Sequence, residues 1–169
     1  WIDYHQFAKD ALGHIVGAKP SEVVAMNHLT VNLHLLLVSF YKPTSKRYKI
    51  LIEAGAFSSD QYVFESQLRF HGRSPDDALI ELEPRKGETY LRTEDIVSEI
   101  ENNREELALI FFGGVQYYTG QFFDIHTIRS AGHKAGAVVG FDLAHAVGNV
   151  LLNLHDDGVD FAAWCSYKY

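Results

Sequence analysis

GFDLAHAVG at residues 140–148 and WCSYK at residues 164–168 are the two stretches of this sequence that decide its fold. The first is an apolar run that stops at Asp142, and the second stops at Lys168. The interval between them has the length of a crossover connection, so we expect two neighbouring parallel strands. An acid and an amine would then lie at adjacent strand ends, where open α/β sheets bind their ligands.

Strand and helix patterns alternate along the chain, which is typical of βαβ units. The run Leu107–Phe112 is continuously apolar, as expected for a parallel strand covered on both faces. The sequence predicts strands at 23–26, 48–52, 78–82 (an edge strand), 107–112, 137–141 and 161–166. It predicts helices at 3–16, 31–41, 61–70, 94–102, 124–134 and 145–154. We therefore predict a three-layer α/β/α fold with a mostly parallel sheet.

Composition excludes several classes of function. The net charge is −7 and the chain has no long basic run, which argues against binding to nucleic acid or to an anionic membrane. No apolar run approaches the roughly 18 residues that span a bilayer. The single cysteine, Cys165, excludes an intrachain disulfide and is interpreted as a packing residue within a strand. We expect a cytoplasmic protein.

Polar and aromatic residues follow several of the predicted strands. Thr30 is a suitable N-cap, so a helix N-terminus that binds anions is expected beside Leu29. Parallel strands place all their carboxyl ends on one side, so these groups can converge. The candidates are Leu29, Thr30, Phe57, Ser58, Ser59, Asp60, Gly113, Gly114, Gln116, Tyr117, Tyr118, Asp142, His145, Tyr167 and Lys168.

Two of these residues indicate a cofactor. A carboxylate that faces a pyridinium nitrogen and a lysine that forms an imine are both required for a pyridoxal phosphate site. Lys168 follows an apolar run, which predicts a poorly solvated amine with a lowered pKa.

The simpler interpretations remain open at this point. Lys168 can be an ordinary surface lysine, and Asp142 can be the N-cap of a helix. Phe57 can be a core residue, and Gly113 with Gly114 can form an ordinary turn. The spacing of Asp142 and His145 also suits a metal, but no further ligand lies at close helical spacing, so no metal site is predicted.

Several longer runs resemble those of the kynureninase family, pyridoxal phosphate enzymes of the fold-type-I aminotransferase superfamily. The runs are MNHLTVNLH (26–34), FSSD (57–60), GVQYYTGQ (114–121), GFDLAHAVGN (140–149) and WCSYKY (164–169). The resemblance covers essentially the whole chain. Ser58 departs from it, standing where many members have Pro, and Gly113 stands where some have a Ser that reaches the cofactor phosphate.

The resemblance implies a role for each candidate. Lys168 would form the Schiff base with the cofactor, Asp142 would pair with its ring nitrogen, and Tyr167 would bind its phosphate and donate a proton. These three are the expected catalytic residues. The other residues expected to contact the cofactor are Leu29 and Thr30 at the phosphate, Phe57 and His145 at the ring, the motif residues Ser58, Ser59 and Asp60, and Gly113.

The implied reaction is hydrolysis of the Cβ–Cγ bond of L-kynurenine or 3-hydroxykynurenine, giving anthranilate or 3-hydroxyanthranilate and L-alanine, in the tryptophan catabolism that leads to NAD biosynthesis. A homodimer is implied. Residues 1–169 would be part of the large cofactor domain, lacking an N-terminal segment, the rest of that domain and a small C-terminal domain, with weak or no activity alone. The alternatives are another fold-type-I enzyme, such as an aminotransferase or a cysteine desulfurase, and a truncated inactive module.

Overall fold

A five-stranded parallel sheet forms the centre of the computed structural model, which describes residues 2–168. Trp1, and Tyr169 of the run at 164–169, lie outside the described residues. The strands are β1 (Lys49–Glu53), β2 (Leu79–Leu82), β3 (Leu107–Gly113), β4 (Val138–Asp142) and β5 (Phe161–Ala163). Their order is β2-β1-β3-β4-β5, and every neighbouring pair is parallel. The prediction of a mostly parallel sheet with an edge strand at 78–82 is confirmed, since β2 is at the edge and comprises four of those residues.

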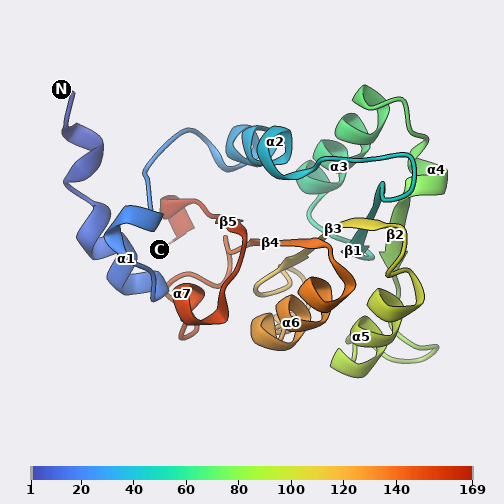
Figure 1. The fold of residues 1–169 in the computed structure, drawn as a ribbon. Helices are drawn as coiled ribbons and strands as arrows, with labels where there is room; N and C mark the ends of the chain where they lie inside the picture. Colours follow the sequence, from blue (N-terminus) through green and yellow to red (C-terminus); the bar gives the residue numbers. More distant parts are fainter. Residues whose placement is uncertain (1, 169) are drawn as a thin grey trace.

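Helices cover both faces of this sheet, so the predicted three layers are also confirmed (Figure 1). The helices are α1 (Lys9–Val16), α2 (Leu29–Phe40), α3 (Ser58–Phe70), α4 (Pro75–Ala78), α5 (Thr93–Asn102), α6 (Ile125–Ala135) and α7 (Leu154–Asp157). Three 3-10 helices are η1 (Tyr4–Gln6), η2 (Pro20–Glu22) and η3 (Ser166–Lys168).

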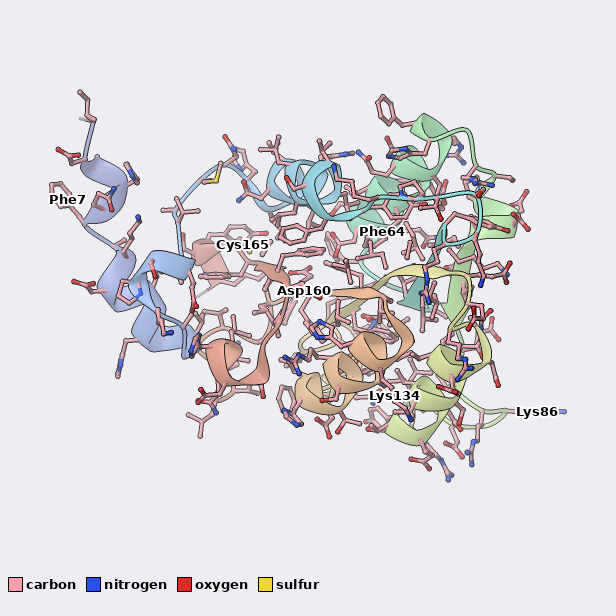
Figure 2. The ribbon with its side chains drawn as sticks, in the orientation of Figure 1. Phe7, Phe64, Lys86, Lys134, Asp160 and Cys165 are labelled. Atoms are coloured by element: carbon pink, nitrogen blue, oxygen red, sulfur yellow. The ribbon has the colours of Figure 1, made fainter. Side chains whose placement is uncertain are left out.

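Alternate residues of β3 point to different cores. Leu109 and Phe111 pack with α2 and α3, whereas Ile110 and Phe112 pack with α5 and α6. Phe64 of α3 contacts Phe111 with ring centroids 4.9 Å apart, and it lies between its helix and the sheet (Figure 2). Apolar cover on both faces is the physical reason that this strand is continuously apolar.

The prediction of a strand at 23–26 is wrong. This segment makes no ladder, and Val24 and Met26 are 51% and 60% exposed. It leads into α2, which begins at Leu29 with His28 as its N-cap, so Thr30 lies in the first turn and is not the cap. An apolar run forms a strand only where a neighbouring strand offers hydrogen bonds, and none pairs with this segment in the described sheet.

The prediction of a helix at 145–154 is also wrong. Residues 144–149 form successive turns, held by bonds such as Val147 N to Leu143 O at 3.0 Å, and the next helix is only the short α7. Gly148 has a φ of 78°, a left-handed conformation that ends right-handed helical geometry. The chain therefore connects β4 to β5 through turns and the short α7.

The strand predicted at 161–166 ends at Ala163 instead. Ala163 pairs with Asp142, the last residue of β4, so the ladder has no partner beyond that point. Cys165 is therefore outside the strand and partly buried, and Lys168 lies in η3 and not at a strand end (Figure 2). The prediction that Cys165 packs inside a strand is wrong.

Other element boundaries shift by a few residues. The predicted helix 3–16 divides into η1 and α1, and α1 ends at Val16 as predicted, with Gly17 as its C-cap. The helix predicted from residue 61 begins at Ser58, and the helix predicted from residue 94 begins at Thr93. In the described part of the chain, no helix is long and apolar enough to cross a membrane.

The Gly140→Ala substitution should destabilise the fold by about 1–3 kcal/mol, because overpacking strains a close-packed core. A Cβ at Gly140 would lie 2.3 Å from the buried Phe161 ring. Urea unfolding measures the change. In a Phe161→Leu background the same substitution should cost clearly less, because the smaller side chain leaves room. Equal costs in the two backgrounds would refute the ring contact as the cause.

Candidate functional site

A cavity of about 190 Å³ opens where the carboxyl ends of β1, β3 and β4 meet the N-termini of α2 and α3. Ten of the eleven residues predicted to contact a cofactor line it: Leu29, Thr30, Phe57, Ser59, Asp60, Gly113, Asp142, His145, Tyr167 and Lys168. Their convergence follows from the parallel sheet. Their roles toward a ligand stay predictions.

Ser58 does not line the cavity. It is the first residue of α3 and is exposed, whereas Ser59 lines the cavity and Asp60 is buried within it. Successive helical residues are rotated by roughly 100°, so three consecutive side chains cannot face the same space.

Asp60 and Asp142 form a hydrogen-bonded carboxyl pair in this cavity. Burial, then the charge of Asp142 and the hydrogen bond to it, raises the pKa of Asp60 to about 8. Burial also raises the pKa of Asp142. Two hydrogen bonds act in the opposite direction and lower it: one from Ala144 N to Oδ1 at 2.8 Å, and one from Asp60. Two adjacent buried carboxyls do not both ionise readily, so the pair retains one proton near neutral pH, carried by Asp60 as the donor.

Glu53 is a third carboxyl in the cavity that sequence reasoning missed. It is the last residue of β1, only 5% exposed, and its Oε2 accepts a hydrogen bond from Gly113 N at 2.9 Å. Burial raises its pKa to about 7. The signal was present, because Glu53 ends an apolar strand run as Asp142 does, but the carboxylate at that strand end was not singled out.

Lys168 contacts His145, with the Lys Nζ 2.9 Å from Nε2 of the imidazole. Burial, followed by the positive charge of Lys168, lowers the pKa of His145, so the ring is neutral at pH 7 and accepts from the ammonium group. Lys168 itself is exposed, so the predicted poorly solvated pocket is absent from the described structure. No group of three or more His, Cys, Asp or Glu side chains within residues 2–168 is arranged to hold a metal ion.

Aromatic rings form one wall of the cavity. Tyr117 meets Phe57 edge to face, with centroids 5.2 Å apart and an interplanar angle of 90°. Phe57 is 43% exposed, which leaves ring surface free for a planar ligand. Gln116 orders the loop that carries Tyr117: its Oε1 accepts from Tyr118 N at 2.6 Å, and its Nε2 donates to Gly55 O at 3.2 Å. No role had been assigned to Tyr117.

Leu29 and Thr30 place the start of α2 at the cavity. The first N–H groups of a helix have no partner within it, and the helix dipole favours negative charge there. The site therefore combines an anion-binding end, a ring surface, a lysine and three carboxyls. These are the groups that a planar ligand with a phosphate and a cationic ring requires.

The chain matches one known protein family over nearly its whole length. The family model for class-V aminotransferases matches residues 8–169. The chain is 64% identical to kynureninase of Flavobacterium psychrophilum over all 169 residues, which are 40% of that protein. It is 62% identical to kynureninase of Nematostella vectensis over the same residues, which are 36% of it. The chain thus spans about 40% of the length of the curated relatives it matches first.

Solved structures share the fold at low sequence identity. A cysteine desulfurase of Thermococcus onnurineus superposes with a TM-score of 0.75 at 18% identity, over 95% of this chain and 38% of that one. A ureidoglycine-glyoxylate aminotransferase of Bacillus subtilis gives 0.71 at 17%, over 93% and 38%. At such identities the likeness concerns the fold alone.

Asp60→Asn should make the chain more stable relative to wild type as the pH rises from 5 to 8, by roughly 1–3 kcal/mol. The pKa of Asp60 is raised to about 8 in the folded state, from 3.8. Between these values the folded chain holds a proton that the unfolded chain has lost, so wild-type stability falls with rising pH, and asparagine removes that fall. Denaturant unfolding at each pH measures it, with Asp76→Asn on α4 as the control for losing a charge. A pH-independent difference for Asp60→Asn would contradict the shared proton.

Proposed function

The chain belongs to the class-V aminotransferase family, and we propose that it forms the cofactor-binding part of a kynureninase that uses pyridoxal phosphate. The proposed reaction adds water across the Cβ–Cγ bond of L-kynurenine and yields anthranilate and L-alanine. The identity of 64% and 62% to kynureninases of a bacterium and a sea anemone supports the substrate. The single observation that supports pyridoxal phosphate as the cofactor is that Lys168 and Asp142 line the same cavity.

The residues of the cavity fit pyridoxal phosphate. Burial raises the pKa of both Asp142 and Asp60, because it disfavours their charged forms. A cationic ring nitrogen beside Asp142 would offset this penalty by stabilising the carboxylate. The start of α2 at Leu29 and Thr30 suits the phosphate, and the half-exposed ring of Phe57 suits the pyridine. We propose that these residues hold the cofactor and that Lys168 attaches it.

Each residue then has a defined task. When bound, pyridoxal phosphate would supply an electron sink for the bonds at the substrate Cα. Asp142, kept ionised by the proton on Asp60, maintains the positive charge on the ring nitrogen. Lys168 moves the proton at Cα, and the neutral His145 at 2.9 Å orients its amine.

Tyr167 is proposed to bind the phosphate and to donate a proton to the substrate. A side-chain hydrogen bond between its hydroxyl and Cys165 raises the pKa of Tyr167 and keeps the proton on the phenol. Tyr167 is 82% exposed, so it can reach a ligand in the cavity after giving up that bond.

A desulfurase or aminotransferase activity gains less support. The desulfurase structures that superpose on this chain are 18% and 14% identical to it, far below its identity to kynureninases. A desulfurase requires a mobile cysteine nucleophile, whereas Cys165 is partly buried and shares a side-chain hydrogen bond with Tyr167.

We further propose that residues 1–169 are part of a larger cofactor domain and that the isolated chain has weak or no activity. The whole protein is proposed to be a homodimer that is located in the cytoplasm and acts in tryptophan catabolism. The coverage of about 40% of each relative supports the first two points. An apolar groove of about 480 Å³ between the 24–27 segment, α2 and residues 162–167 supports burial against further protein. The single cysteine suits a reducing compartment. Sedimentation and cell fractionation test assembly and compartment.

Pyridoxal phosphate followed by borohydride should leave a pyridoxyl group on Lys168, read by peptide mass spectrometry of the naturally expressed protein. In Lys168→Arg the adduct should vanish and cleavage of L-kynurenine should fall by at least about 10²-fold, because a group that moves protons contributes 10²–10⁴.

Lys134→Arg at the exposed end of α6 is the matched control and should keep both properties (Figure 2). An adduct on another lysine would refute the assignment of Lys168. An adduct at Lys168 without anthranilate release would point to a different reaction of the same family.

A further inference from the structure

Glu53 is a buried carboxyl to which the proposed reaction gives no task. It ends β1, which lies between β2 and β3, and it is 5% exposed while lining the cavity. Among residues 2–168, no lysine, arginine or histidine forms an ion pair with it. Buried carboxyls without a cationic partner are costly, so their presence in a ligand cavity calls for an explanation.

Its contacts are at the C-terminal end of β3, at Gly113. Glu53 Oε2 accepts from Gly113 N at 2.9 Å, and a Cβ at Gly113 would lie 3.1 Å from Oε1. A side chain at position 113 would therefore be in tight contact with the Glu53 carboxyl. The adjacent Gly114 N donates to Asp142 O at 2.8 Å. Two consecutive backbone N–H groups therefore bind the two carboxyl-bearing residues: Gly113 N binds the side chain of Glu53, and Gly114 N binds the backbone of Asp142.

Glu53 also faces the other two carboxyls of the cavity. The negative charge of Asp142 at the end of β4 adds to the effect of burial in raising the pKa of Glu53, and Glu53 in turn raises that of Asp60 on α3. The remaining titratable groups that line the cavity are His28, Tyr117, His145, Tyr167 and Lys168. Near neutral pH the three carboxyls hold fewer than three negative charges, and Glu53 is poised to gain or lose its proton.

We propose that Glu53 is a positioning residue that anchors the C-terminal end of β3 at Gly113 and releases its proton to solvent when the cationic ring of the cofactor binds beside Asp142. This inference rests on the proposed function. A positive charge in the cavity favours the ionised carboxylate, and only the O–H bond of Glu53 breaks. Ring binding and proton release are then linked, so the affinity for the ring rises with pH.

The test uses 4′-deoxypyridoxine 5′-phosphate, which has the ring and the phosphate but no aldehyde to react with Lys168. Calorimetry on the naturally expressed, cofactor-free protein at pH 6, 7 and 8, in two amine-free buffers of different ionisation enthalpy, gives affinity and proton release together. From pH 6 to 8, wild-type affinity should rise about 3- to 10-fold more than that of Glu53→Gln, since one pKa unit is tenfold. At pH 7 wild type should release more protons.

Glutamine keeps an acceptor for Gly113 N, so a purely structural role would leave the pH profile and the proton count as in wild type, and that result would overturn the inference. Glu81→Gln on the neighbouring β2, exposed and outside the cavity, is the matched control and should behave as wild type. Wild-type protein that forms no pyridoxyl adduct contradicts the proposed function itself, and the inference falls with it.

If Glu53→Gln does not fold, carboxyl ¹³C resonances of the wild-type protein decide the question. A glutamate resonance whose titration midpoint lies near pH 7 and shifts to lower pH on addition of the analogue supports the inference. Glutamate resonances that the analogue leaves unchanged overturn it.

Discussion

The parallel pairing of β3 with β4 is the constraint on which the site depends. It sets Gly113 opposite Asp142, and Gly114 N extends the contact by donating to Asp142 O. The pairing of β1 with β3 on the other side brings Glu53 to Gly113. Because parallel strands end on the same side, this lateral order gathers carboxyls from two strands at one edge, facing the N-termini of α2 and α3.

That gathering has an electrostatic cost. Asp60, Asp142 and Glu53 all have raised pKa values, chiefly because burial penalises their charged forms. Each unit of such a shift corresponds to about 1.4 kcal/mol between the two protonation states. The fold tolerates the cluster by retaining protons, which is also what prepares it for a cation. Stability and ligand binding thus draw on the same three groups.

The most regular parts of the fold were predictable from sequence. The continuous apolar run at 107–112 indicated a doubly covered strand, and β3 is one. Prediction failed where the outcome depended on a partner or on one dihedral angle. Residues 23–26 have strand character but no strand beside them, β5 ends where β4 ends, and the left-handed Gly148 prevents the helix expected at 145–154.

The sequence by itself determined the alternation of strand and helix and the placement of Asp142 at a strand end. Through long runs such as those at 114–121 and 140–149, it also determined the resemblance to one enzyme family. Only the tertiary structure decided which side chains share the cavity. It added Glu53, placed Tyr117 on the wall of the cavity, turned Ser58 outward and moved Cys165 out of the sheet. The reason is distance along the chain: Glu53 meets a glycine 60 residues away, and such a contact is set by lateral strand order and not by any local pattern.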